Sequence, residues 1–509
     1  MHAGHLVAAL ALAAACGGPR PVAPPPPTPE AAPLDAAAPD AAPVGLTAAD
    51  VAADLATLRT TLDALHPGLH RYLTPAELDA ALAAAAAEAT AAPTTATVVL
   101  ALARLTARLR CGHTFVNPSN QSDEVRAAVM SAPRVPFAFR WIGEELVVTR
   151  SLDPRAALTP GTIIERIDGV AAADLRARLL PLGRADGGNQ AKRLASLEVH
   201  ADAAIEAFDV YAPLVAPELA PPYALELRSP DGARSQLTVE AMTAEARAAL
   251  AAEVEPDASD DGPQWQLRWL DARTGYLPMA SWVTYHRKRD WAADVDAIMA
   301  EVAARPKARL IVDLRGNEGG TDVGARILAH VVTRPVPARD RERWVRYRSV
   351  PEALRAPLDT WDRSFFDWGA DAVASDDPAW FRLADEPGAD TIAPATPRFR
   401  GKLIVLVDAS NSSATFQFAH QVQTLGAGTL VGEPTGGNQR GLNGGAFFFM
   451  HLPRTGVEVD LPLIGSYPPG RRVDGVPDGG VTPDRVVITT AADLAAGRDP
   501  QLAVARALR

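Results

Sequence analysis

The strongest constraint on the fold is an alternation of apolar strands and amphipathic helices between residues 274 and 431. A strand buried on both faces is apolar throughout, whereas a strand with one wet face alternates with polar residues. The runs here are apolar throughout, and helical patterns separate them. Strands are expected at 274–281, 309–314, 403–408 and 429–431, and helices at 291–304, 322–332 (capped by Thr321) and 414–425. The pattern predicts an α/β core whose sheet is covered on both faces.

The residues before this core show two other patterns, one helical and one of short β segments. Apolar residues recur at helical spacing after Thr47, which predicts a helical region over 47–115 with helices near 50–65, 75–91 and 94–110. Short β segments at 135–139, 145–149 and 162–167 and a helix at 175–182 indicate a small β domain over 130–245. Residues 185–245 either complete that domain or form a second β unit.

An insertion at 335–398 interrupts the core between two of its strands and is rich in tryptophan and phenylalanine. So many aromatic residues in a connection favour a helical subdomain or a lid over a site, or equally a peripheral packing unit.

The length, charge and cysteine content of the chain limit the kinds of function it can have. A chain of 509 residues is expected to hold more than one domain. The net charge of −11, without a long basic block, argues against a nucleic-acid partner. Two cysteines exclude a disulfide scaffold and a cysteine-built zinc site, and the ten histidines form no helical metal-binding pair. Neither a metal nor another cofactor is therefore expected.

The first residues are predicted to be a targeting segment. The apolar run 6–15 is too short to cross a bilayer as a helix. It ends at Cys16, and residues 1–16 resemble a bacterial lipoprotein signal in which Cys16 becomes the lipidated first residue; an ordinary secretory peptide is the alternative. Residues 17–46, rich in proline and alanine, predict a semi-extended tether. We expect an exported lipoprotein, periplasmic or on the outer-membrane or cell surface, that meets the membrane through its lipid anchor only.

Polar segments after the core strands carry the candidate chemistry. In 312–320 a strand ends in a glycine-rich turn, which leaves backbone N–H groups for an anion or an oxyanion. In 407–415 a strand enters a helix through several serines. A serine there is more often a cap than a nucleophile, and composition does not choose among them. In 431–441 a polar loop follows the next strand.

These segments, in this order, resemble the tail-specific (C-terminal-processing) serine peptidases and their relative, the tricorn protease core. Gly-Glu-Pro-Thr at 432–435 matches the family's Gly-Glu-x-Thr, and the family spacing then places the nucleophile at Ser413. Gly-Val-Thr-Pro-Asp at 480–484 is similar to the family's closing motif. The resemblance implies a crotonase/ClpP-like spiral ββα catalytic core at 265–509, preceded by the helical region and a PDZ-like β domain.

The resemblance also bears on the general base. The tail-specific branch uses a lysine in the loop after Gly-Glu-Pro-Thr, where this sequence has Asn438, so a Ser–Lys dyad is excluded at that place. The tricorn-like branch takes its base from a histidine after an N-terminal helix. Cys-Gly-His-Thr at 111–114 resembles that branch's Asp-Gly-His-Thr and implies His113 as the base. Cys111 itself is expected to be a buried apolar residue.

Further site residues follow from the same resemblance. The N–H of Ala414 and that of Gly319 or Gly320 would stabilise an oxyanion. A histidine base usually has an acidic partner, and Asp478 is the nearest acid to the family position, although a simple turn role suits it equally.

The sequence thus predicts a serine peptidase that cleaves peptide or protein substrates through an acyl-enzyme on Ser413 with His113 as base. Arg440 and Asn438 are candidate substrate contacts, Arg440 for a substrate carboxylate or else as a solvated charge. An esterase is an open alternative, because the same groups cleave esters. The changes at Asn438 and at Phe416, which replaces the family's glutamate, also admit an inactive peptide-binding surface lipoprotein. An acyl-CoA enzyme of the crotonase type has the least support.

Overall fold

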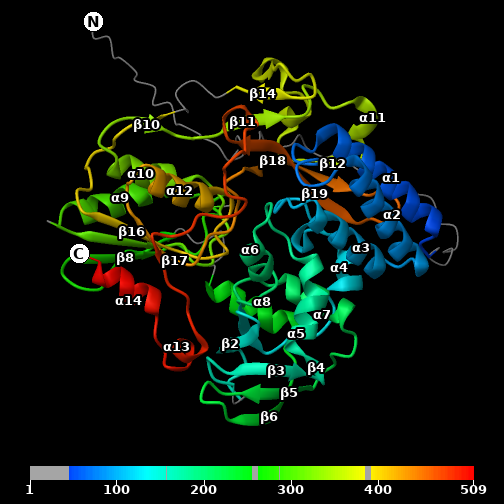
Figure 1. Ribbon diagram of the computed structural model, residues 1–509, viewed down its shortest axis with the longest axis horizontal. Coiled ribbons are helices and arrows are strands. Elements are labelled where there is room, and N and C mark those ends of the chain that lie inside the picture. The colour runs from blue at the N-terminus through cyan, green and yellow to red at the C-terminus, as the bar shows by residue number, and fades with distance from the viewer. Residues whose placement is uncertain are drawn as a thin grey trace, which may run out of the picture.

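The computed structural model describes residues 45–155, 158–254, 262–285, 287–305, 307–384 and 391–508. The predicted signal at 1–16, including Cys16, and nearly all of the 17–46 tether lie outside these residues. The structure has helices at the N-terminus, then a small β domain and an α/β core, and a further antiparallel sheet whose strands, within residues 342–467, are inserted between those of the core (Figure 1). Among the helices described, none combines the length and apolarity needed to cross a membrane.

The α/β core is built on a sheet of order β20–β17–β16–β9–β8–β7. All neighbours pair in parallel except β7 with β8. The strands are β7 (Arg268–Trp269), β8 (Thr274–Pro278), β9 (Arg309–Asp313), β16 (Lys402–Val407), β17 (Thr429–Gly432) and β20 (Arg485–Val486). The helices are α9 (Trp291–Ala303), α10 (Val323–Val331), α12 (Ser413–Thr424), α13 (Ala491–Ala495) and α14 (Pro500–Ala507). The predicted alternation is confirmed.

Both faces of this sheet are covered. Successive strand residues point to opposite faces. Leu310 and Val312 of β9 join the cluster that includes Val295 of α9, whereas Ile311 packs in the cluster with Ala505 of α14. Figure 1 shows α9, α10 and α12 on one side and α14 on the other.

The predicted cap of α10 is wrong by one residue. Asp322, not Thr321, is the N-cap, and its side chain accepts the N–H of Ala325. An aspartate carboxylate reaches the first-turn N–H groups well. The Thr321 hydroxyl is bonded instead to Thr284 at 2.6 Å.

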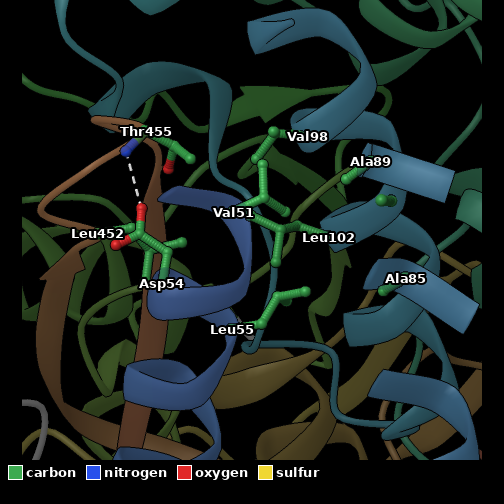
Figure 2. Close-up of a pocket in the computed structure, with 10 residues that line it drawn as sticks. Val51, Asp54, Leu55, Ala85, Ala89, Val98, Leu102, Leu452 and Thr455 are labelled. Atoms are coloured by element: carbon green, nitrogen blue, oxygen red, sulfur yellow. Dashed lines mark hydrogen bonds between the residues drawn. The ribbon is translucent and has the colours of Figure 1, made fainter. Parts of the chain in front are cut away.

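The N-terminal helices match the prediction to within about two residues, the usual uncertainty of helix ends. They are α1 (Ala48–Leu65), α2 (Pro75–Ala91) and α3 (Thr95–Arg108), each begun by a threonine capping box. They pack on the hairpin of β18 (Leu442–His451) and β19 (Glu458–Tyr467) (Figure 1). Figure 2 shows Asp54 of α1 reaching the hairpin turn, where it accepts the N–H of Thr455 at 2.7 Å beside an apolar lining.

The small β domain has one sheet of order β1–β2–β3–β5–β6, with β4 paired to β3. Its strands are β1 (Phe137–Ile142), β2 (Glu145–Ser151), β3 (Ile163–Ile167), β4 (Val170–Ala171), β5 (Tyr223–Arg228) and β6 (Arg234–Val239). Its helices, with the one that leads into it, are α4 (Asp123–Val129), α5 (Ala172–Leu179), α6 (Gln190–Ala195), α7 (Ala207–Val215) and α8 (Ala244–Val254). Residues 185–245 therefore complete this domain.

The aromatic insertion is mainly β, so the prediction of a helical subdomain is wrong. The third sheet has the order β12–β18–β19–β11–β14–β13. The insertion supplies β11 (Glu342–Val345), β12 (Leu358–Asp359), β13 (Ala372–Ala374) and β14 (Phe381–Leu383), and β10 (Val336–Pro337) pairs with β15 (Thr391–Ile392). Its α11 (Glu352–Arg355) is a single turn. Aromatic side chains suit a pleated surface, and β18 and β19 offer strands to pair with.

Candidate active site

Ser413 lies at the junction of β16 and α12. It is the first residue of the helix and has a φ of +49°, a left-handed conformation that non-glycine residues rarely adopt. The N-cap is Ser412, and neither serine caps the helix through its side chain. Asn411 fixes the turn, because its side chain accepts the N–H of Asp408 at 2.8 Å and donates to the Asn317 carbonyl at 3.0 Å. The strained residue is held by its surroundings, as is common at functional sites.

The glycine turn after β9 packs directly on Ser413. A Cβ on Gly319 would lie 2.9 Å from the Ser413 Cβ and 3.0 Å from the Ala414 nitrogen. Its φ of +114° also requires glycine. The structure thus brings together the predicted nucleophile and the predicted oxyanion residues.

The hydrogen bonds distinguish the two glycines. The N–H of Gly319 donates to Asn317 Oδ1 at 2.8 Å. The N–H of Gly320 donates to no acceptor within the described part of the chain. Ala414 stands in the first turn of α12, where N–H groups have no intrahelical acceptor. Of the three predicted oxyanion residues, Gly320 and Ala414 therefore have N–H groups without an acceptor among the described residues, whereas the N–H of Gly319 is occupied.

His113 stands in the turn after α3. Its ring centroid lies 5.8 Å from that of Phe447, and a Cβ on Gly444 would lie 3.8 Å from Nε2. Nδ1 is buried and has no hydrogen-bond partner among the described residues. Burial lowers the pKa of His113 from its ordinary value, and the nearby Asp186 carboxylate opposes this shift. The imidazole is therefore neutral at neutral pH and able to accept a proton.

The turn that carries His113 is held by the β domain. Asp186 Oδ1 accepts the N–H of Gly112 at 2.9 Å, and Arg184 donates to the Gly112 carbonyl at 3.0 Å. A Cβ on Gly112 would lie 2.9 Å from the Asp186 carboxylate. Cys111 is buried as predicted, and burial raises the pKa of its thiol to about 11, so it is not a nucleophile at neutral pH.

Arg184, Lys192 and Glu318 form what we call the charged clamp. Arg184 pairs with Glu318 at 2.6 Å, and Lys192 pairs with the other Glu318 oxygen. Lys192 Nζ also donates to the Ser410 carbonyl at 3.0 Å. Burial opposes ionisation of Glu318, but Arg184 and Lys192 hold its pKa well below its usual range. The clamp ties together the His113 turn, the glycine turn and the serine loop.

Asp478 is placed differently from the prediction. Its carboxylate accepts hydrogen bonds from Tyr72 Oη at 2.6 Å, Asn438 Nδ2 at 2.7 Å and the N–H of Gly188 at 3.1 Å. None of its hydrogen bonds among the described residues goes to His113. Asp478 is thus connected to the base only indirectly, since Asn438 also donates to the Asp186 carbonyl at 3.1 Å.

The structure does not support Asn438 as a substrate contact. Asn438 is fully buried, and its amide oxygen accepts the N–H of Arg440. The Arg440 side chain donates to the Val476 carbonyl at 2.8 Å and lies 3.8 Å from Asp478. With Arg71 and Arg471 it lines a cavity of about 400 Å³.

Phe416, which replaces the family's glutamate, supports α12 by packing. Its side chain is fully buried and its ring stacks on that of His420, 6.0 Å away between centroids. Phe416 is therefore part of the hydrophobic core that contains α12.

Residues 273–487 match the family model of peptidase family S41. These residues belong to peptidase family S41. The matched segment contains Ser413 and the glycine turn and identifies the enzyme class as a serine-type peptidase. His113 lies outside it. No curated protein matches the chain significantly in sequence.

Solved structures of CPAF share the fold. Mature CPAF has a TM-score of 0.58 and 14% identity, covering 88% of this chain and 94% of its own. Mature CPAF complexed with lactacystin has a TM-score of 0.59 and 14% identity, covering 88% of this chain and 95% of its own. A serine-to-alanine mutant of CPAF has a TM-score of 0.60 and 14% identity, covering 88% of this chain and 94% of its own. The mixed α/β fold with N-terminal helices and several sheets is therefore shared over most of both chains.

Sequence reasoning missed Asp186 and the charged clamp. Glu318 lies within the glycine-rich segment 312–320, but the residues that pair with it, Arg184 and Lys192, are distant in the sequence. Lys192 lies in the short helix α6, and nothing in the sequence around it indicates a role at the site. Asp186 lies in an Asp-Gly-Gly turn, which by itself reads as ordinary turn chemistry.

Proposed function

We propose that this chain hydrolyses peptide bonds through an acyl-enzyme on Ser413, with His113 as general base. The observation that carries the proposal is the strained Ser413 at the start of α12, packed on Gly319 beside two free N–H groups. A helix cap needs neither the strain nor the contact. A nucleophile needs both, because its hydroxyl must stand clear of the helix and next to oxyanion donors.

In the proposed reaction, Ser413 Oγ attacks the substrate carbonyl while His113 accepts its proton. The oxyanion takes hydrogen bonds from the N–H groups of Ala414 and Gly320, at the positive end of α12. The imidazolium then gives its proton to the leaving amine. Water repeats the sequence on the acyl-enzyme and releases Ser413.

Asp186 has better support than Asp478 as the acidic neighbour of His113. Its carboxylate holds the N–H of Gly112 and is the foremost charge that raises the His113 pKa. A negative charge there stabilises the imidazolium formed during attack. Asp478 would act one step further away, through Asn438 and the Asp186 backbone.

We also propose a crotonase/ClpP-like spiral for the core and a PDZ-like role for the β domain, whose exposed edge strand β6 would be open to a peptide. We further propose export and lipidation at Cys16. Incorporation of an alkynyl fatty acid that is lost in Cys16→Ala would support the anchor, and incorporation unchanged by that substitution would exclude it.

Hydrolysis of a mixed peptide library, read by mass spectrometry, tests the function. Ser413→Ala and His113→Ala should each abolish cleavage, while Ser131→Ala, at an exposed position outside the β sheets, should cleave at the wild-type rate. Cleavage of esters without cleavage of any peptide would favour the esterase. Peptide binding without turnover, unaffected by His113→Ala, would favour the inactive binding protein.

A further inference from the structure

Aromatic side chains extend outward from the ring of the proposed base. The ring centroid of Phe447 lies 5.8 Å from that of His113 and 5.9 Å from that of Trp361. Trp361 lies 5.8 Å from Phe449. We call Trp361, Phe447 and Phe449 the aromatic ladder. It is continuous with the proposed catalytic site through the contact between Phe447 and His113.

The ladder occupies a face of β18 that would ordinarily be polar. Side chains alternate along this strand: Ala446, Phe448 and Met450 are buried, whereas Phe447 and Phe449 are only half-buried. A strand with one solvated face usually carries polar residues on it. Aromatic residues there leave apolar area in contact with water, which typically marks a binding surface.

The insertion adds the most exposed member. Trp361 follows β12, which pairs with β18 so that Asp359 stands opposite Phe449. The Trp361 side chain is 41% exposed although its edge packs on Phe365 at 5.5 Å. Trp361 thus contacts Phe365, Phe447 and Phe449 and still exposes a large part of its surface.

The path between the base and the ladder is clear of side chains on β18. Gly444 lies against the His113 ring, and Gly445 is exposed. In the proposed reaction the peptide lies beside His113 while Ser413 attacks its carbonyl, so a neighbouring side chain of that peptide comes within reach of Phe447, which contacts His113. Nothing on Gly444 or Gly445 stands in its way.

We propose that the aromatic ladder is a specificity subsite for a large apolar, preferably aromatic, side chain next to the scissile bond of the substrate. This inference rests on the proposed function. We assign the occupant as a substrate side chain because the ladder begins at the proposed base, His113. Binding of a partner protein or a membrane would not require contact with the base. Burial between aromatic rings favours such a side chain over glycine by about tenfold in affinity.

Binding in the Ser413→Ala background tests the subsite without turnover. Fluorescence anisotropy would compare two labelled peptides that differ only by phenylalanine or glycine beside the cleaved bond. The Phe peptide should bind about tenfold more tightly, and Trp361→Ala should remove this preference while the Gly peptide binds as before. Trp361→Phe should restore it. The control Ile488→Ala, which truncates a side chain that is 51% exposed elsewhere, should leave it intact.

The outcomes separate this inference from the proposed function. A Phe preference that persists in Trp361→Ala overturns the subsite, even if the wild-type enzyme cleaves peptides. A change confined to self-association or to binding of phosphatidylcholine vesicles overturns it as well, because the ladder then serves another occupant. A lost preference in Trp361→Ala supports the subsite, and the peptide-library assay decides independently whether the chain is active.

Discussion

At the scale of single residues, the site depends on a contact that leaves no room for a side chain. Gly319 touches Ser413, and its backbone has a φ of +114°. We expect Gly319→Ala to lower kcat by about 10²–10³-fold, the loss typical of a disturbed oxyanion site. Gly143→Ala, with a φ of +63° and nothing within 4 Å, is the matched control. Peptidase kinetics would decide, and equal activities in the two variants would contradict the assignment.

The proposed proton acceptor, His113, gives a second prediction at this scale. Burial lowers the pKa of His113 below its ordinary 6.5, so activity should persist as the pH falls below that value and be lost only at lower pH. Asp186 raises this pKa, so Asp186→Asn should move the acid limb of kcat/KM further down and reduce kcat. Asp478→Asn should leave the limb in place. If Asp478→Asn moves the acid limb of kcat/KM and Asp186→Asn does not, Asp478 is the acidic partner of His113, as the sequence predicted.

At the scale of elements, the charged clamp connects turns from separate parts of the chain. Because folding lowers the pKa of Glu318, the ionised carboxylate stabilises the folded protein. This contribution is complete above about pH 4.5 and is lost as the pH falls further. Glu318→Gln should therefore be less stable than wild type at neutral pH, and the difference should narrow in acid. Urea unfolding across this range would measure it, with the exposed Glu124→Gln as control. A difference that stays constant with pH would contradict the ion pairing.

The elements themselves were largely predictable from the sequence. Helix α2 matches its predicted bounds because proline and threonine mark its start locally. The insertion was not predictable, since its strands pair with β18 and β19, distant in the sequence. The same reason hid Asp186: its hydrogen bond to Gly112 joins residues 74 positions apart, and only the fold brings them together.

At the scale of the whole molecule, the site lies where two hydrophobic cores meet. Helix α3, which leads to His113, shares one core with the β domain and the β18–β19 hairpin, and α12 belongs to the other. Asp54 fixes the helices to that hairpin through the N–H groups of Arg454 and Thr455. Asp54→Ala should lower the free energy of unfolding by about 1–3 kcal/mol, because it leaves the buried N–H of Thr455 without its acceptor.

Chemical denaturation would measure how much the contact between Asp54 and the hairpin turn stabilises the protein, with Asp202→Ala, at an exposed position, as control. If Asp54→Ala and Asp202→Ala unfold at the same denaturant concentration, the helices are held by apolar packing alone. The active centre would then depend less on this contact than the burial of Asp54 implies.

The most direct test of the central claim is the site and rate of modification by a fluorophosphonate, read by peptide mass mapping. We expect a single adduct on Ser413 that forms rapidly in wild type and very slowly in His113→Ala. An adduct on another serine, no adduct, or an equal rate in His113→Ala would contradict it.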